Sequence, residues 1–513
     1  MSLFVTQTTE TPETRSGVGL RSERGPVLLA VMMCTALVAI DSTILAAAVP
    51  AVVSDLGGFS QFPWLFSIYL LAQAVSVPIY GKLADGIGRK PVMLIGIALF
   101  LIGSILCGAA WSMPLLIAAR VIQGLGAGSV LPMSITIIGD IYSVEERARV
   151  QGFIASVWGV AALVGPTLGG VFSEYVSWRW IFFVNLPIGA LATVLLLRGF
   201  HENIERVRHR IDWAGAILLT TGVSLLILAL LEGGHSWEWL SPAGIGIVVA
   251  SVVLLVAFVF VERRAAEPIL PLWVFTRRVL IGANLASLVI GAVLIGLTSY
   301  VPTFAQGVLG YGALLSGLAL GAMTIGWPIA AASAGKIYMR FGFRNTSILG
   351  VVFVVLGSAL LLLVDERTSL WAIAAYTFVV GVGLGYASVP TLVAVQSSVD
   401  WDRRGVVTAT NLFFRSLGSA VGVAVFGAIA NATLARDFQT PPAGATGTLP
   451  KTADDAAVVL GDQSGVTAVV RDFVRESLTS ATHQVFIGVL VLAATMIIAV
   501  LVMPRRSEPL VFD

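Results

Sequence analysis

The chain alternates long apolar runs with short polar segments along almost its whole length. Most runs are about 20 residues long, the length at which an α-helix crosses roughly 30 Å of hydrocarbon. The period-two alternation of a membrane β-barrel is missing, so helices must satisfy the backbone polar groups inside lipid. The pattern predicts fourteen spans, at residues 27–50, 62–80, 91–111, 114–138, 150–172, 178–198, 211–231, 242–262, 280–304, 313–334, 346–364, 370–397, 405–430 and 484–503.

Composition supports a membrane protein. The 513 residues are 57% hydrophobic and only 12% charged, whereas a soluble protein of this length needs more charge to cover its surface. The net charge of +2 gives no indication of a nucleic-acid partner. Cys34 and Cys107 lie in apolar runs and are interpreted as packing residues, not as a disulfide or a metal pair. We therefore expect an all-α membrane protein without a metal.

The loops differ in positive charge, which predicts the orientation of the spans. With the N-terminus inside, Lys and Arg concentrate in the inside segments. The even number of spans then places both termini in the cytoplasm. We expect the protein to lie in the cytoplasmic (inner) membrane. The outside segments hold only Arg179, Arg367, Arg436, Lys451, Arg471 and Arg475.

Two loops repeat one another. Residues 81–90 (GKLADGIGRK) and residues 335–344 (GKIYMRFGFR) both begin with Gly-Lys, carry Gly at the eighth position and end in a base. They lie eight spans apart, which predicts two six-helix halves with two inserted helices, since repeated halves are typical of secondary transporters. The predicted organisation is a tail at 1–26, an N-terminal bundle at 27–198, inserted helices and linkers at 199–279, a C-terminal bundle at 280–503 with an outside loop at 431–483 and a short amphipathic helix near 466–480, and a tail at 504–513.

These motifs resemble those of the major facilitator superfamily, in its fourteen-span drug:proton antiporter branch. Residues 81–90 resemble its signature loop, and residues 120–124 (RVIQG) its span-4 motif. Residues 159–170 resemble the span-5 motif of antiporters, and residues 41–50 the span-1 motif of this branch. The resemblance implies the major facilitator fold and a monomer that works by alternating access, with a proton gradient as the energy source and no cofactor.

The chain also departs from that pattern. Ala46 stands where the span-1 motif usually has Asn, so a polar substrate or proton contact is missing there. In the second-half loop, Met339 replaces the acidic residue and Phe343 the arginine. We expect any gate built on that loop to be weaker or different.

Asp41 is the only acidic residue deep inside a predicted span. A carboxylate in a low-dielectric site can gain and lose a proton near neutral pH, as proton coupling requires. By residue count Asp41 and Arg120 both lie roughly 21 Å from the inner face. We predict that they face each other or a shared cavity and couple transport to protons; the alternative is a static ion pair that holds the bundle together.

Residues 81–90 are predicted to form a conformational latch. Gly81 and Gly88 allow a tight turn and close helix approach. Asp85 can accept hydrogen bonds from the N-terminal amides of a neighbouring helix, and Arg89 can pair with Asp140 at the inner end of span 4. The resemblance implies that such a cluster closes the inner side in the outward-open state. The alternative is that these charges only set topology.

A run of small residues in span 5 provides a smooth face for close helix packing. We expect this face to seal the outer half against the opposite bundle, with ordinary packing as the alternative. The run comprises Gly159, Gly165, Pro166, Gly169 and Gly170.

Arg415 lies near the middle of span 13. Two roles are open: attraction of an anionic group, or hydrogen bonding with Asn411 and backbone carbonyls. Further polar and aromatic residues in the spans are candidates for a substrate cavity: Gln73, Gln123, Asn284, Tyr300, Trp327 and Asn411.

The function predicted from these features is proton-coupled export of small lipophilic or cationic compounds such as drugs. A dedicated exporter of one natural product, lipid or siderophore shares the mechanism, and a non-transporting membrane sensor is the alternative of another class. The chain has no Gly-x4-Gly-Lys-Ser/Thr loop for ATP. An enzyme is not expected, because the histidines lie outside the spans without catalytic neighbours: His201, His209, His235 and His483.

Overall fold

The computed structural model describes residues 18–57, 64–202, 212–233, 237–265, 268–439 and 468–505. Within these ranges, fourteen helical segments are long and apolar enough to cross a membrane, as predicted. The helices are α1 (Gly25–Leu56), α2 (Trp64–Ile87), α3 (Arg89–Gly108), α4 (Met113–Ile141), α5 (Val144–Tyr175), α6 (Trp180–Phe183), α7 (Asn185–Gly199), α8 (Trp213–Glu232), α9 (Pro242–Glu262), α10 (Arg278–Gly307), α11 (Ala313–Phe341), α12 (Phe343–Leu360), α13 (Leu370–Ser397), α14 (Arg404–Asp437) and α16 (Ala468–Val502), with short 3-10 turns η2 (Leu272–Phe275), η3 (Leu361–Leu363) and η4 (Trp401–Arg403).

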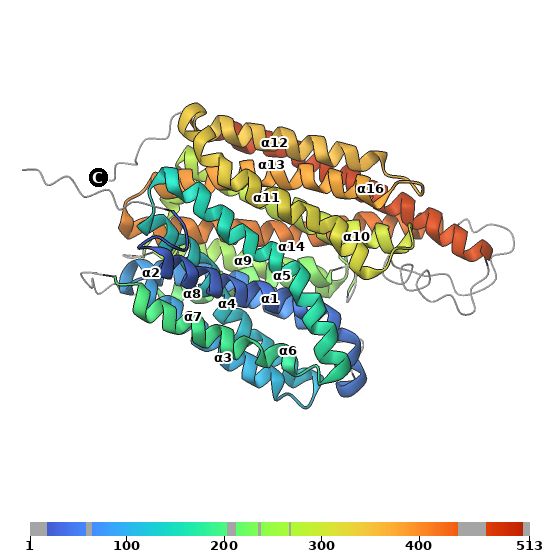
Figure 1. Cartoon of the computed structure of the whole chain (residues 1–513), viewed down its shortest axis with the longest axis horizontal. Coiled ribbons are helices and arrows are strands. Elements are labelled where there is room, and N and C mark those ends of the chain that lie inside the picture. Colours follow the sequence, from blue (N-terminus) through green and yellow to red (C-terminus); the bar gives the residue numbers. More distant parts are fainter. Residues whose placement is uncertain are drawn as a thin grey trace, which may run out of the picture.

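The helices form two groups that lie side by side (Figure 1). The buried apolar side chains of α1–α7 form two clusters within that group, and those of α10–α16 form another. Helix α8 packs against α2 and α14 where the groups meet, with α9 beside it. We call α1–α7 the N-terminal half and α10–α16 the C-terminal half.

Several helix boundaries differ from those predicted. Span 6 is divided into α6 and α7, with Val184 between them. Helix α14 continues to Asp437, well beyond the predicted end of span 13. The amphipathic helix expected near 466–480 is not separate, because its described part is the first section of the continuous helix α16. Of the predicted outside loop, residues 440–467 lie outside the described residues.

The two repeated loops are almost entirely helical, which corrects the prediction. Helix α2 runs to Ile87 and α3 begins at Arg89, so Gly88 alone makes the turn with φ 102°. Helix α11 likewise ends directly before Gly342, which has φ 83°. Side chains rarely allow such φ values, and this explains the glycine at the eighth position of both repeats.

The halves contact one another mainly through the pairs α5–α11 and α2–α14. Near the end where α2 stops and α14 begins, small residues bring the backbones together. A Cβ on Gly335 would lie 3.0 Å from Ala148, and a Cβ on Gly152 would lie 3.2 Å from the Pro328 carbonyl oxygen. We call this the latch end.

The halves separate toward the opposite end, which we call the open end. Gly159 of α5 still approaches Thr324 of α11, where a Cβ would lie 3.4 Å from the Thr324 carbonyl oxygen. Further along, a Cβ on Gly170 of α5, or on Gly317 or Gly321 of α11, would have no neighbour within 4 Å among the residues described. Among the described residues, the two halves therefore pack closely at the latch end, and these glycines make no such close contact at the open end.

Candidate functional site

A buried carboxylate cluster lies inside the N-terminal half. Asp41 of α1 accepts a 2.7 Å hydrogen bond at Oδ2 from Arg120 Nη1 of α4, and both residues are 1% exposed. The other carboxylate oxygen, Oδ1, accepts from Gln123 Nε2 at 2.7 Å and from Asn185 Nδ2 at 3.1 Å. An ionised carboxylate withdrawn from water requires such partners.

A second layer of contacts holds the partners of Asp41 in place. The Arg120 guanidinium donates to Gln123 Oε1 at 2.7 Å and to the Leu65 carbonyl at 3.1 Å, and it lies 4.1 Å from the centre of the Tyr69 ring. The Ser104 hydroxyl accepts from Gln123 Nε2 at 2.9 Å. The cluster thereby joins α1, α2, α3, α4 and α7, so a change at Asp41 can reach most of the N-terminal half.

The structure brings Asp41 and Arg120 together, as the depth of the two residues predicted. Gln123, predicted to line a substrate cavity, is fully buried in this cluster instead. Ser104 and Tyr69 were missed. A serine or tyrosine in an apolar run gives no signal, because its role depends on residues from other helices. Asn185 had a local signal, since it begins α7 directly after the break in span 6.

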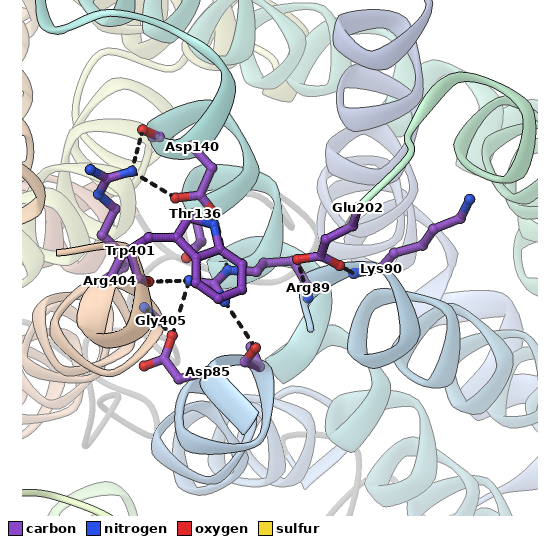
Figure 2. Close-up of polar contacts among 12 residues, drawn as sticks. Asp85, Arg89, Lys90, Thr136, Asp140, Glu202, Trp401, Arg404 and Gly405 are labelled. Carbon is purple, nitrogen blue, oxygen red and sulfur yellow. Dashed lines mark hydrogen bonds and ion pairs between the residues drawn. The ribbon is translucent and has the colours of Figure 1, made fainter. Parts of the chain in front are cut away.

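A second cluster joins the two halves at the latch end. Asp85 of α2 accepts hydrogen bonds from the backbone N–H groups of Gly405 and Val406, each at 2.8 Å (Figure 2). These are N-terminal amides of α14, whose own N-cap residue, Arg403, provides no capping side chain. A carboxylate at this position satisfies unpaired amides and interacts favourably with the helix dipole.

Arg89 is the buried centre of this cluster, with no exposed surface. Its guanidinium forms ion pairs with Asp85 at 3.2 Å and with Asp140 of α4 at 3.0 Å. It also lies 3.6 Å from the centre of the Trp401 ring and donates to the Trp401 carbonyl. Arg89 therefore connects α2 and α4 of one half to the segment that precedes α14 in the other.

Further contacts between the halves surround Arg89. Arg404 Nη1 donates to Asp140 Oδ1 at 2.9 Å, and Arg147 Nη1 donates to Ser397 Oγ at 3.3 Å. On the N-terminal side, Glu202 accepts from the backbone N–H groups of Arg89 and Lys90, each at 3.0 Å (Figure 2). The roles of Trp401, Arg404 and Glu202 were missed, because the predicted latch included only Asp140 as a partner of Arg89, and the partners from distant segments have no local signal.

The corresponding loop of the C-terminal half lacks both the acid and the arginine that form these ion pairs. Met339 and Phe343 occupy the repeat positions of Asp85 and Arg89. Here the Tyr338 hydroxyl donates to the Val144 carbonyl, and its ring lies 4.9 Å from the Phe343 ring. Helix α5 does not need an acid from the other half, because Ser143 and Glu146 form its own capping box.

The small-residue run of α5 is divided between two partners. Gly159 faces Thr324 of the opposite half, whereas Gly165 packs against Thr43 and Ile44 of α1, within its own half. Gly170 has no such neighbour. In this conformation the run does not act as one continuous face against the opposite bundle.

The remaining cavity candidates fall into two groups. Asn411 of α14 is buried against α10, where its side chain accepts from Ser287 at 2.9 Å and donates to Asn284 at 3.3 Å. This pairing does not involve Arg415. Arg415 is only partly buried, as are Gln73, Tyr300 and Trp327.

A third polar contact lies at the open end. Asp55, at the end of α1, accepts from Trp178 Nε1 at 2.9 Å and from Arg179 Nη1 at 2.7 Å. These hydrogen bonds, that from Trp178 first, lower the pKa of Asp55 below its ordinary value. The contact stays within the N-terminal half.

The chain is similar to known transporters over most of its length. The family model described as Major Facilitator Superfamily matches residues 31–423. A protein of Bacillus subtilis, "Multidrug resistance protein 3", is 36% identical over 403 residues, which is 79% of each chain. "Efflux pump dotC" of Dothistroma septosporum is 32% identical over 496 residues, which is 94% of this chain and 84% of that one.

A solved structure shows the same fold. The crystal structure of the human organic anion transporter MFSD10 (TETRAN) matches with a TM-score of 0.59 and covers 92% of this chain and 99% of that one. At 14% sequence identity this likeness concerns the fold alone. Together with the fourteen spans and the match to the family model, it leads to one conclusion: the chain belongs to the major facilitator superfamily of membrane transporters.

Proposed function

We propose that the chain is a proton-coupled exporter of small lipophilic compounds that works by alternating access. It lies in the cytoplasmic (inner) membrane with its latch end and both termini in the cytoplasm. The loop charges support this orientation, because Lys82, Arg89, Lys90 and Arg147 all lie at the latch end. The multidrug and efflux names of its relatives support export.

The Asp41 cluster is the observation that carries the proposal. Asp41 has three side-chain donors, and among the described residues Arg120 forms an ion pair with no other carboxylate. Proton uptake by Asp41 removes the charge that holds Arg120 and places an O–H donor among side chains that are themselves donors, so at least one of the hydrogen bonds from Arg120, Gln123 and Asn185 must rearrange. Protonation thereby changes the packing energy of five helices at once, which gives the proton its influence on conformation.

The latch provides the second state-dependent element. The structure is closed at the latch end, so opening this end requires Asp85 to leave the amides of α14 and Arg404 to leave Asp140. A hydrogen bond that involves a charged group contributes about 1.5–3 kcal/mol. Several such contacts must break when the latch end opens. The free energy of substrate and proton binding must therefore offset the free energy of these contacts.

The Asp41 cluster does not select for positively charged substrates. Asp41 is enclosed in the N-terminal half, so it does not support a preference for cationic compounds. A dedicated exporter of one natural product, lipid or siderophore would use the same machinery. The latch argues against a non-transporting sensor, because a sensor does not need contacts that close one side of a membrane path.

The proposal is tested with purified full-length protein in proteoliposomes. A pH gradient is imposed across the membrane, and the export of a panel of lipophilic dyes is followed. We expect export that depends on the gradient and stops when a protonophore collapses it. Export that continues at the same rate after the collapse would refute proton coupling, and the absence of flux for the whole panel would favour the sensor.

A further inference from the structure

Arg415 is an unpaired positive charge in the middle of a membrane helix. It lies eleven residues after the start of α14, roughly 16 Å along the helix axis. Among the described residues, no carboxylate forms an ion pair with its guanidinium, no acceptor receives a hydrogen bond from it, and no aromatic ring lies against it. Its Asn411 neighbour is bonded to α10 instead. A charge in this position is costly unless a partner compensates it.

The side chain cannot turn toward α10. The backbones of α14 and α10 touch at this level, where a Cβ on Gly291 would collide with the Arg415 carbonyl oxygen and a Cβ on Gly418 with the Leu288 carbonyl oxygen. Ser419 reinforces the contact by donating to the Gly291 carbonyl at 3.1 Å. The close approach leaves no room for a guanidinium between these helices.

The section of α14 two turns before Arg415 lies in a layer that joins the halves. Thr408 lies seven residues, or about two turns, before Arg415 on the same face. The Thr408 hydroxyl accepts from Gln396 Nε2 of α13 at 3.2 Å, and the same amide contacts the Ile135 carbonyl of α4 at 3.2 Å. This layer joins the halves and closes the bundle. Arg415 lies two turns beyond it, toward the open end, and is partly exposed.

The balance of charge favours an anion at this level. Asp41 and Arg120 compensate each other inside the N-terminal half. Arg415 has no such partner in the part of the chain that the structure describes, so the space beside it carries an uncompensated positive charge. A cationic group there would meet repulsion in a low-dielectric site, whereas an oxyanion would supply the missing acceptor.

We propose that Arg415 binds the negatively charged group of the transported substrate, and that the substrates are lipophilic compounds with a carboxylate, sulfonate or phosphate group. This inference rests on the proposed export function and names its substrate class. The planar guanidinium can bind two oxygens of such a group at once, which gives both orientation and affinity. The apolar part of the substrate then occupies the space between the halves.

The test uses two xanthene dyes of similar size and opposite charge, sulforhodamine B and rhodamine 6G. Binding to the solubilised full-length protein is followed by fluorescence anisotropy for the wild type, Arg415→Gln and Arg415→Lys. We expect Arg415→Gln to weaken sulforhodamine B binding by roughly tenfold to a hundredfold. Arg415→Lys should retain part of the affinity, since it keeps the positive charge but loses the planar guanidinium that can bind two oxygens at once. Rhodamine 6G binding should stay unchanged or become tighter.

Arg340→Gln is the matched control, because Arg340 is an exposed arginine near the end of α11. It should leave both dyes unaffected. The inference is overturned if the wild type does not bind sulforhodamine B, if Arg415→Gln binds it as well as the wild type, or if Arg415→Gln weakens both dyes equally. Binding needs no gradient, so binding that depends on Arg415 without gradient-driven flux would refute only the proposed coupling.

Discussion

The carboxylate of Asp85 accepts a 2.8 Å hydrogen bond from the backbone N–H of Gly405, which lies 320 residues further along the chain in the other half of the bundle. Asp85 thus caps a helix that has no capping side chain of its own. A helix end that depends on an acid from the opposite half is stable only when the halves are together at the latch end. This makes the start of α14 the place where closure and local helix stability are linked.

Asp85→Asn should weaken closure of the latch end. The amide keeps one acceptor oxygen but loses the charge that interacts with the α14 dipole and with Arg89, at a cost of about 1–3 kcal/mol. Ala331→Cys reports on closure, because Ala331 is fully buried near this end. With Cys34 and Cys107 replaced by Ser, we expect the Asp85→Asn change to raise labelling of this cysteine by a maleimide several-fold. Equal labelling would show that Asp85 does not hold the latch.

Trp401→Leu tests the stacking of Arg89. Leucine keeps an apolar side chain but removes the aromatic face over which the guanidinium lies at 3.6 Å. We expect the loss of about 1 kcal/mol and a correspondingly faster labelling of the same cysteine. Trp371→Leu is the control, since Trp371 is 82% exposed. A result in which both tryptophan variants behave alike would assign no specific role to Trp401.

The glycines of the two motifs should respond differently to alanine. A Cβ on Gly81 would lie 2.9 Å from the Gly405 carbonyl oxygen and would also meet Ala409, so Gly81→Ala should force α2 and α14 apart and reduce transport. Gly170→Ala adds a methyl group with no neighbour within 4 Å and should be tolerated in this conformation. Transport rates at matched expression compare the two. Normal transport by Gly81→Ala would contradict the close packing at the latch.

Asp55 should not contribute to the pH dependence of transport. Its hydrogen bonds with Trp178 and Arg179 lower its pKa below the ordinary 3.8. The stability that this pairing contributes is therefore present above that ordinary pKa and is lost only as the pH falls through the lowered pKa. Between about pH 5 and 8 the group stays ionised. We expect Asp55→Asn to change the amplitude of transport at most, and a shifted pH profile would contradict this.

The depth of residues in the predicted spans predicted the pairing of Asp41 with Arg120. Asp41 and Arg120 were paired by counting residues from the membrane faces, and the helical repeat makes such counting dependable. Gly88 was likewise expected to allow a tight turn, and the repeat places Gly342 at the same position in the second loop. Gly88 and Gly342 both have positive φ, which only a residue without a side chain adopts easily.

The rest of the site depends on contacts that no local pattern reveals. Asp85 was expected at a helix N-terminus, but its sequence neighbours do not indicate that the helix is α14. Ser104 and Trp401 acquire their roles only from the packing of distant helices. Gln123 was placed in a cavity because it is polar, although a buried carboxylate can satisfy a polar side chain equally well.

The central claim is that Asp41 couples protons to export, and it is tested most directly by gradient-driven export in proteoliposomes that contain Asp41→Asn. The account predicts that this variant loses the stimulation by the pH gradient, by about tenfold or more, while exchange of dye across the membrane without a gradient persists. Glu366→Gln, at an exposed position between α12 and α13, should behave as the wild type. Full gradient-driven export by Asp41→Asn would contradict the account.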